Sequence, residues 1–246
     1  MRDVGERNVT VSGAGRIEGG TYGTVRIAGA GRVVGDLVAE EFKAAGSAKV
    51  EGNLKAQRFE AAGSFKCEGD LEVEEGEAAG SLKVEGHLHA KELKLAGSAR
   101  AKSIRGGYLR AGGSLGVEEN VEVETFRLIG AFEIGGLLSA DRVEVELEGR
   151  ARAQEIGGEK ILIRAGQRSL GGFLSTALGL ILGHASPKEL VAEIIEGDEI
   201  ELEATQARLV RGGRIKIGPG CRIERVEYTD SLEVAPGAQV KEEVKG

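Results

Sequence analysis

Apolar and polar positions along this chain alternate in short stretches that recur at a fixed spacing. The clearest stretch begins with Ala-Gly-Ser and starts at Ala45, Ala62, Ala79 and Ala96, each at the seventeenth position after the one before. Within each repeat the apolar residues come in pairs two positions apart, which is the spacing of side chains on one face of a β-strand. Glycine and polar residues separate the pairs, as expected at turns. So short a repeat predicts β-coils of about 17 residues stacked into a solenoid.

Alignment of the repeats on their Gly-Ser pairs gives six columns without a charged residue, although charged residues make up 30% of the chain. The columns begin at Val33, Leu37, Ala39, Phe42, Ala44 and Ala48 and continue to Ile134, Leu138, Ala140, Val143, Val145 and Phe132. They form three pairs, so each coil should contain three short strands around a triangular core. Six inward side chains cannot offset the entropy of ordering a coil, so stability must belong to the stack.

The register of these columns changes along the chain. It slips by one residue between Ala101 and Ile104 and becomes indistinct after Val145. We interpret it as resuming near Ile200, because the same spacing recurs in two sets: Ile200, Ile217 and Val234, and Ala204, Cys221 and Ala238. We therefore expect an all-β chain with a main β-helix array over 9–164, an irregular and partly helical insert over 165–190, and C-terminal coils over 191–246.

The expected insert contains the most apolar run of the chain, Phe173 to Leu182. The run is too short for a membrane span, which needs about 20 residues. It either folds onto the rod's own surface or contacts a membrane interface or a partner. In the second case the contact residues are Phe173, Leu174, Leu178, Ile181 and Leu182. The segment Ser186-Pro187-Lys188-Glu189 has the pattern of a helix start, with Ser186 as the N-cap.

Charge and cysteine content restrict the environment and the partners. The formal net charge of −7 and the pI near 5.3 argue against nucleic acid as a partner. Cys67 and Cys221 form no CxxC pair, so neither a disulfide framework nor a zinc knuckle is indicated. The N-terminal segment MRDVGERNVT lacks the apolar region of a secretory signal. We expect a cytoplasmic protein.

The histidines are the first candidates for chemistry. His87 and His89 flank the inward Leu88, so both should point outward and are potential metal ligands. No acidic residues are in phase with them, and His184 lies in the irregular segment. We expect two surface histidines and no metal site.

The cysteines and the glycine-rich N-terminal segment also have structural explanations. Cys67 and Cys221 occupy columns of small apolar residues, where a thiol is buried and inert. The sequence GAGRIEGG at Gly13 is followed by more β-repeat, whereas a phosphate loop precedes a helix. We therefore expect no catalytic residue, no cofactor and no bound nucleotide.

The two ends of a β-solenoid expose unpaired backbone groups and apolar side chains. Only Met1 to Asn8 precede the first strand-like stretch, and only Lys241 to Gly246 follow Val240, so neither end should be capped. We expect end-to-end self-association through Val9, Val11 and Ile17 at one end and Leu232, Val234 and Val240 at the other. Pro236 in the last coil opposes this, because proline blunts a strand edge, so a monomer remains the alternative.

The repeat AGS-x-K-V-E-G-x-L-x-A, the segment IEGDEIELEAT at Ile195 and the segment VRGGRIKIGPGC at Val210 together resemble the bactofilin family of polymer-forming cytoskeletal proteins. The resemblance implies a right-handed parallel β-helix that polymerises without nucleotide in the bacterial cytoplasm, often at the inner face of the cell membrane. Such filaments scaffold envelope, shape or motility machinery. Two features depart from the family pattern: the internal insert, and the lack of the apolar N-terminal membrane peptide of some members.

The expected function is therefore a structural scaffold that assembles end to end and binds partner proteins of the cell envelope or of motility. Two alternatives stay open. One is a β-helix enzyme, an acyltransferase, lyase or hydrolase, with its site in a lateral groove. The other is a monomeric adaptor, which differs from the scaffold only at its ends.

Overall fold

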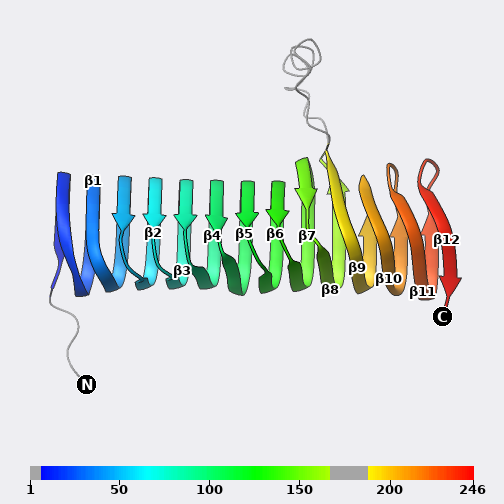
Figure 1. Cartoon of the computed structure of the whole chain (residues 1–246), viewed down its shortest axis with the longest axis horizontal. Coiled ribbons are helices and arrows are strands. Elements are labelled where there is room, and N and C mark those ends of the chain that lie inside the picture. Colours follow the sequence, from blue (N-terminus) through cyan, green and yellow to red (C-terminus); the bar gives the residue numbers. More distant parts are fainter. Residues whose placement is uncertain (1–6, 167–187) are drawn as a thin grey trace, which may run out of the picture.

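The computed structural model describes residues 7–166 and 188–246 and shows one long rod of stacked β-coils (Figure 1). Twelve parallel strands follow one another along the rod in chain order, and the described residues contain no helix. The strands are β1 (Val9–Val50), β2 (Leu54–Cys67), β3 (Leu71–Val84), β4 (His87–Ala101), β5 (Ser103–Val117), β6 (Val121–Ile134), β7 (Leu137–Arg152), β8 (Glu155–Ala165), β9 (Glu189–Leu202), β10 (Thr205–Ile217), β11 (Arg222–Val234) and β12 (Gln239–Lys245).

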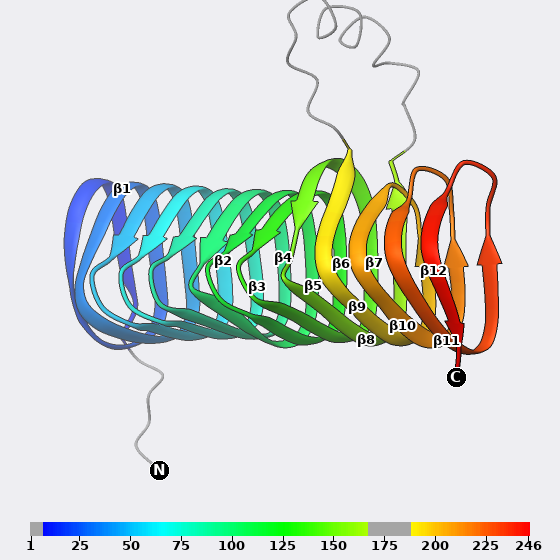
Figure 2. The same cartoon turned by 45° about the vertical axis from the view of Figure 1, so that its right-hand side comes forward.

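Each of these elements bends around the rod, so that one labelled strand supplies several sides of a coil (Figure 2). The apolar columns found by aligning the repeats correspond to columns of side chains stacked in the core. Leu37, Leu54 and Leu71 pair in register, and the column continues through Leu88, Ile104, Val121 and Leu138. All seven side chains are at most 2% exposed. Val123, in another column, is half-buried and departs from the pattern.

Large side chains stack on one another inside the core. The rings of Phe42 and Phe59 lie 5.7 Å apart and nearly parallel, and Phe65 meets Phe59 edge to face at 4.8 Å. Such geometries add about 0.5–1.5 kcal/mol per pair beyond the burial of area. The one-residue slip after Ala101 is confirmed, because Leu88 pairs with Ile104 and this step is one residue shorter than the step from Leu71 to Leu88.

The stack of coils continues directly across the predicted insert. Residues 150–152 of β7 pair with residues 189–191 of β9, and residues 155–163 of β8 pair with residues 194–202 of β9. The residues on either side of 167–187 thus belong to one continuous stack. The interpretation of Glu189 as part of a helix start is wrong, since this residue begins β9; Ser186 and Pro187 lie outside the described residues.

The predicted register of the C-terminal coils is correct in part. Ile217 pairs with Val234 as expected. Its partner on the other side is Leu202, and Ile200 pairs instead with Ile215, so the step from β9 to β10 is two residues shorter than the regular repeat. Ile217 and Val234 therefore occupy equivalent positions in successive coils. Ile200 has the same spacing from Ile217 in the sequence, but it does not lie in their column of the structure.

One corner of the rod is a column of glycines. From Gly13 through Gly29, Gly46, Gly63, Gly80, Gly97 and Gly113 to Gly130, every member has a positive φ. A Cβ at Gly63 would lie 2.3 Å from the carbonyl oxygen of Gly46 in the preceding coil. The corner therefore requires glycine for two reasons, the backbone conformation and the close approach of the coil below.

Replacement of Gly63 by alanine should lower the free energy of unfolding by more than about 1–2 kcal/mol, because a left-handed conformation and a steric overlap must both be accommodated. Gly116→Ala is the matched control: its Cβ would lie 3.4 Å from the Arg100 side chain and its φ is ordinary. The control should stay within about 0.5 kcal/mol of the unsubstituted protein. Denaturant unfolding followed by circular dichroism measures both, and equal effects would contradict the account of the corner.

Candidate functional site

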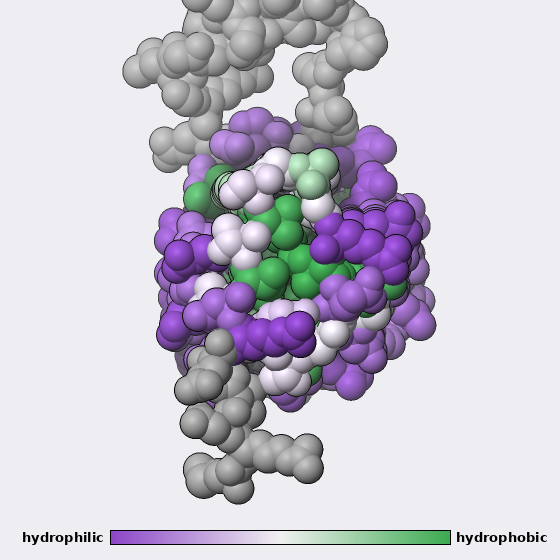
Figure 3. Space-filling view, turned by 90° about the vertical axis from the view of Figure 1, so that its left-hand side faces the viewer, coloured by the Kyte–Doolittle hydropathy of each residue, from purple (hydrophilic) through white to green (hydrophobic). Residues whose placement is uncertain are grey.

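The N-terminal end of the rod presents an apolar centre surrounded by polar side chains (Figure 3). Val9 and Val11 are half-buried and pack against the core from the first coil. Ile17, the third residue predicted at this end, is only 4% exposed and belongs to the buried core. Two of the three predicted residues thus offer surface to a second molecule.

The C-terminal end is open along one side. β12 pairs with residues 222–228 of β11, and no strand of the described chain pairs with the outer side of residues 231–234. Val234 on this edge is 41% exposed, while Leu232 and Val240 are half-buried against the core. Val244, which the sequence reasoning missed, is half-buried in β12, beyond the last recognised repeat. Apolar side chains and free backbone groups therefore coincide here.

The predicted membrane or partner contacts Phe173, Leu174, Leu178, Ile181 and Leu182 lie outside the described residues. The residues on both sides of this segment are held to the rod. The backbone N–H of Ala165 donates to Glu203 at 2.9 Å, and Lys188 donates to the carbonyl oxygen of Gly166 at 3.2 Å. Within 7–166 and 188–246 there is no helix with the length and apolarity that a membrane crossing would require.

Of the histidines, His87 belongs to a hydrogen-bond ladder at a second corner. In each step of the ladder, a side-chain oxygen accepts a hydrogen bond from a backbone N–H group of the next coil, at 2.7–2.8 Å. The acceptor and donor residues are Asp36 and Asn53, then Asn53 and Asp70, then Asp70 and His87. The ring of His87 continues the ladder to Ser103 at 2.7 Å. His89 is exposed on the neighbouring face, and the described residues contain no group of three or more side chains able to hold a metal ion.

Both cysteines are buried in the core, as their columns predict. Burial raises the pKa of Cys67 to about 11, and it also raises the pKa of Cys221. The two thiols therefore stay protonated near neutral pH, where a nucleophilic cysteine would be a thiolate.

The outer faces of the rod are covered by ion pairs between successive coils. Lys49 lies 2.9 Å from Glu68 in the next coil and 3.2 Å from Glu51 in its own. The hydrogen bond to Glu68 is the main reason why the pKa of Lys49 is raised, and the same bond holds the pKa of Glu68 below its usual value. Exposed pairs like these contribute little stability each, but they neutralise the faces on which they lie.

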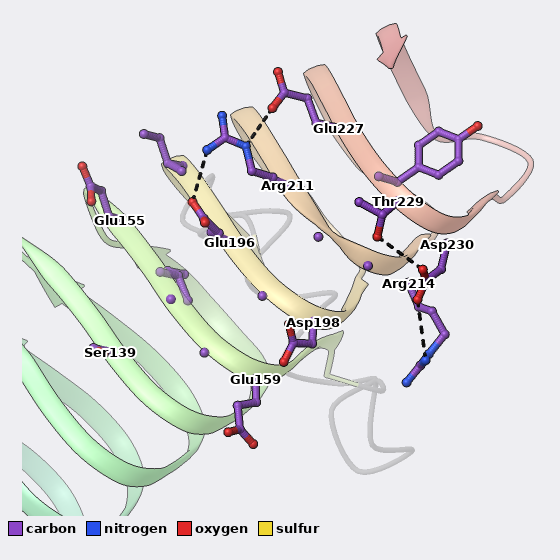
Figure 4. Close-up of a pocket in the computed structure, with 18 of the residues that line it drawn as sticks. Ser139, Glu155, Glu159, Glu196, Asp198, Arg211, Arg214, Glu227, Thr229 and Asp230 are labelled. Atoms are coloured by element: carbon purple, nitrogen blue, oxygen red, sulfur yellow. Dashed lines mark hydrogen bonds and ion pairs between the residues drawn. The ribbon is translucent and has the colours of Figure 1, made fainter. Parts of the chain in front are cut away.

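A groove of about 1090 Å³ crosses the face formed by β7 to β12 (Figure 4). Glycines take up its floor, among them Gly158, Gly197 and Gly212, where a Cβ would lie 2.1–2.3 Å from a carbonyl oxygen of the coil below. Seven carboxylates and two guanidinium groups line it: Asp141, Glu155, Glu159, Glu196, Asp198, Glu227, Asp230, Arg211 and Arg214. Sequence reasoning missed this groove because it is built across coils whose steps are irregular.

The two arginines of the groove are already paired. Arg211 bridges Glu227 at 2.7 Å and Glu196 at 3.6 Å, as Figure 4 shows. Arg214 pairs with Glu199 and lies 3.9 Å from Asp230. Lys160 and Arg214 together hold the pKa of Glu199 down to about 2. The groove is thus predominantly anionic.

Comparison with known proteins adds relatives but no activity. No family model matches the chain, and no solved structure matches it. The chain is 40% identical over 114 residues to the uncharacterized protein YhbE of Bacillus subtilis (strain 168), a match that covers 46% of this chain and 44% of YhbE. It is 37% identical over 111 residues to the uncharacterized protein YhbF of the same strain, covering 45% and 42%. The matches thus span less than half the length of either curated relative.

The low pKa of Glu199 gives a direct test of the charge arrangement at the rim of the groove. A carboxyl whose pKa is lowered on folding stabilises the protein above its ordinary pKa of 4.5, and this contribution is lost as the pH falls toward about 2. In Lys160→Gln/Arg214→Gln the pKa of Glu199 should rise toward 4.5, as measured by an NMR titration of its carboxyl carbon. Lys55→Gln, which removes a distant ion pair, should leave it unchanged. A wild-type value already near 4.5 would contradict the arrangement.

Proposed function

We propose that this protein is a structural scaffold that assembles end to end into filaments without nucleotide, in the manner of the bactofilins that its repeat resembles. The observation that carries the proposal is the coincidence, at the end of a rigid rod, of a free strand edge with the exposed Val234. A second molecule stacked there would pair the backbone and cover the apolar side chains in one contact.

The opposite end supports the same proposal. Val9 and Val11 are partly buried and pack against the core at this end, whereas the sides of the rod carry ion pairs. Two adhesive ends on one rod give an open polymer and not a closed ring, whichever ends meet. In this proposal the filament works in the bacterial cytoplasm, also at the inner face of the membrane, and its sides bind proteins of the cell envelope or of motility.

Filament length tests the proposal through two matched substitutions. Val234→Asp places a charge on the open edge and should weaken association at least tenfold, about 1.4 kcal/mol or more, since the carboxylate would lose water at the junction. Val38→Asp introduces the same charge at an equally exposed valine, 42% against 41%, on the side of the rod. Negative-stain microscopy and sedimentation without nucleotide should show short assemblies only for Val234→Asp. Val11→Asp should act like Val234→Asp at the other end.

Circular dichroism and the melting midpoint serve as the folding control for all three variants. Filaments of wild-type length in both Val234→Asp and Val11→Asp would refute end-to-end assembly. Equal shortening by Val38→Asp would point to lateral association instead. A wild-type protein that sediments as a folded monomer at every salt concentration would favour the monomeric adaptor.

A further inference from the structure

A row of stacked carboxylates lines the groove of β7 to β12. Arg142 pairs in register with Lys160, and Lys160 with Glu199. The residues directly before these three are Asp141, Glu159 and Asp198, so they lie level with one another on consecutive coils, about 4.8 Å apart. Figure 4 shows Glu159 and Asp198 projecting from neighbouring strands on the same side of the groove.

The cations next to this row are engaged elsewhere. Arg142 pairs with Glu144, and Lys160 and Arg214 both pair with Glu199. Within the described residues, Asp141, Glu159 and Asp198 have no ion-pair partner of their own, although all three line an open groove. Their charges therefore repel one another, and only attraction between Asp198 and Arg214 offsets part of this repulsion.

Other columns of the rod show what the fold does when only stability is at stake. In some outward columns opposite charges follow each other from coil to coil, as in Lys43 with Glu60. Where cations stack instead, as in the column of Lys49, Lys66 and Lys83, each lysine forms an ion pair with a glutamate of a neighbouring column. Like charges at directly opposed positions of a sheet are destabilising. Three stacked carboxylates on consecutive coils thus oppose folding slightly, and a positively charged ligand would relieve their repulsion.

The shape of the groove identifies the kind of cation. No three of its carboxylates come close enough to hold a metal ion in the described structure. They are spread instead along two sides, with Glu155, Glu196 and Glu227 facing the row just described across the glycine floor (Figure 4). From Ser139 to Glu227 the groove crosses four coil steps, about 19 Å at about 4.8 Å each, which matches about six residues of extended chain.

We propose that this groove binds an extended segment of a partner protein that is rich in lysine and arginine. The glycine floor leaves room for the backbone of the segment, and its long cationic side chains reach the carboxylates on either side. The half-buried Tyr228 also lines the groove, and its ring offers a face for one cation. The biological use of this surface rests on the proposed scaffold function, but the binding itself requires no filament.

Fluorescence anisotropy of a labelled twelve-residue peptide of alternating lysine and serine tests the proposal on the full chain. Wild type should bind it with a saturable curve that weakens steeply as salt is raised. Asp141→Asn/Glu159→Gln/Asp198→Asn should weaken binding at least tenfold. The control Glu40→Gln/Glu77→Gln/Glu118→Gln changes the net charge equally, at exposed residues outside the groove, and should change binding less than twofold.

Several outcomes would overturn the proposal. Equal weakening by both triple variants would mean nonspecific attraction to an acidic protein, and so would tight binding of the wild type to a glutamate-serine peptide only in low salt. Saturable binding of Ca²⁺ alone in calorimetry, lost in the groove variant, would make the groove a metal site. A melting midpoint lowered in the groove variant would assign the row a structural role, whereas relief of repulsion predicts an equal or higher midpoint.

The filament assay separates this inference from the proposed function. The groove variant should form filaments of wild-type length, because Asp141, Glu159 and Asp198 belong to β7, β8 and β9, within the stack and not at its ends. Peptide binding without filaments would leave the groove standing and remove the scaffold. Filaments without peptide binding would support the scaffold and rule out the groove as a binding site.

Discussion

Close parallel stacking of one coil on the next is the interaction on which the rest of this structure depends. Strand pairing brings neighbouring coils to about 4.8 Å from each other, and at that distance a corner has no room for a Cβ above a carbonyl group. The column of positive-φ glycines from Gly13 to Gly130 follows directly from this limit. The same limit places every side chain opposite its equivalent in the next coil, so that apolar residues form columns and charges form ladders.

The stacking also decides which surfaces are available for function. The sides of the rod carry ion pairs such as Lys49 with Glu68 and few exposed apolar side chains, whereas apolar side chains gather at the ends. The exceptions stand out because the rule is so regular. Two of them are the open edge at Val234 and the row of carboxylates beside the glycine floor of the groove. A rod that polymerises through its ends would repeat such a groove at regular intervals along a filament.

Regular spacing makes most of the fold predictable from the sequence. The columns through Leu54 and Phe59 are buried as expected. Their inward positions could be recognised because they stay apolar in seven nearly identical coils. Prediction fails where coils change length. The step from β9 to β10 is shorter than the regular one, and no local pattern distinguishes Ile215 from Ile217 as the partner of Ile200. The residues at Glu189 fit the sequence pattern of a helix start, but parallel pairing with β7 and β8 makes them a strand.

The candidate sites are predictable to a smaller extent for a related reason. An end is defined by where repeats stop, so Val9, Val11 and Val234 can be named from sequence alone. The groove depends on strands whose register steps are irregular: one residue longer than the regular repeat from β7 to β8, more than twice as long from β8 to β9, and two residues shorter from β9 to β10. No linear pattern connects Asp141, Glu159 and Asp198, and only the paired structure places them side by side.

Fibre diffraction or cryo-electron microscopy of assemblies formed without nucleotide tests the central claim most directly. If coils stack through the subunit junctions as they do within the rod, the layer spacing of about 4.8 Å should run parallel to the filament axis and continue across each junction. Rods lying crosswise to the filament, a break in the layers at every junction, or no assembly at any salt concentration would contradict the account.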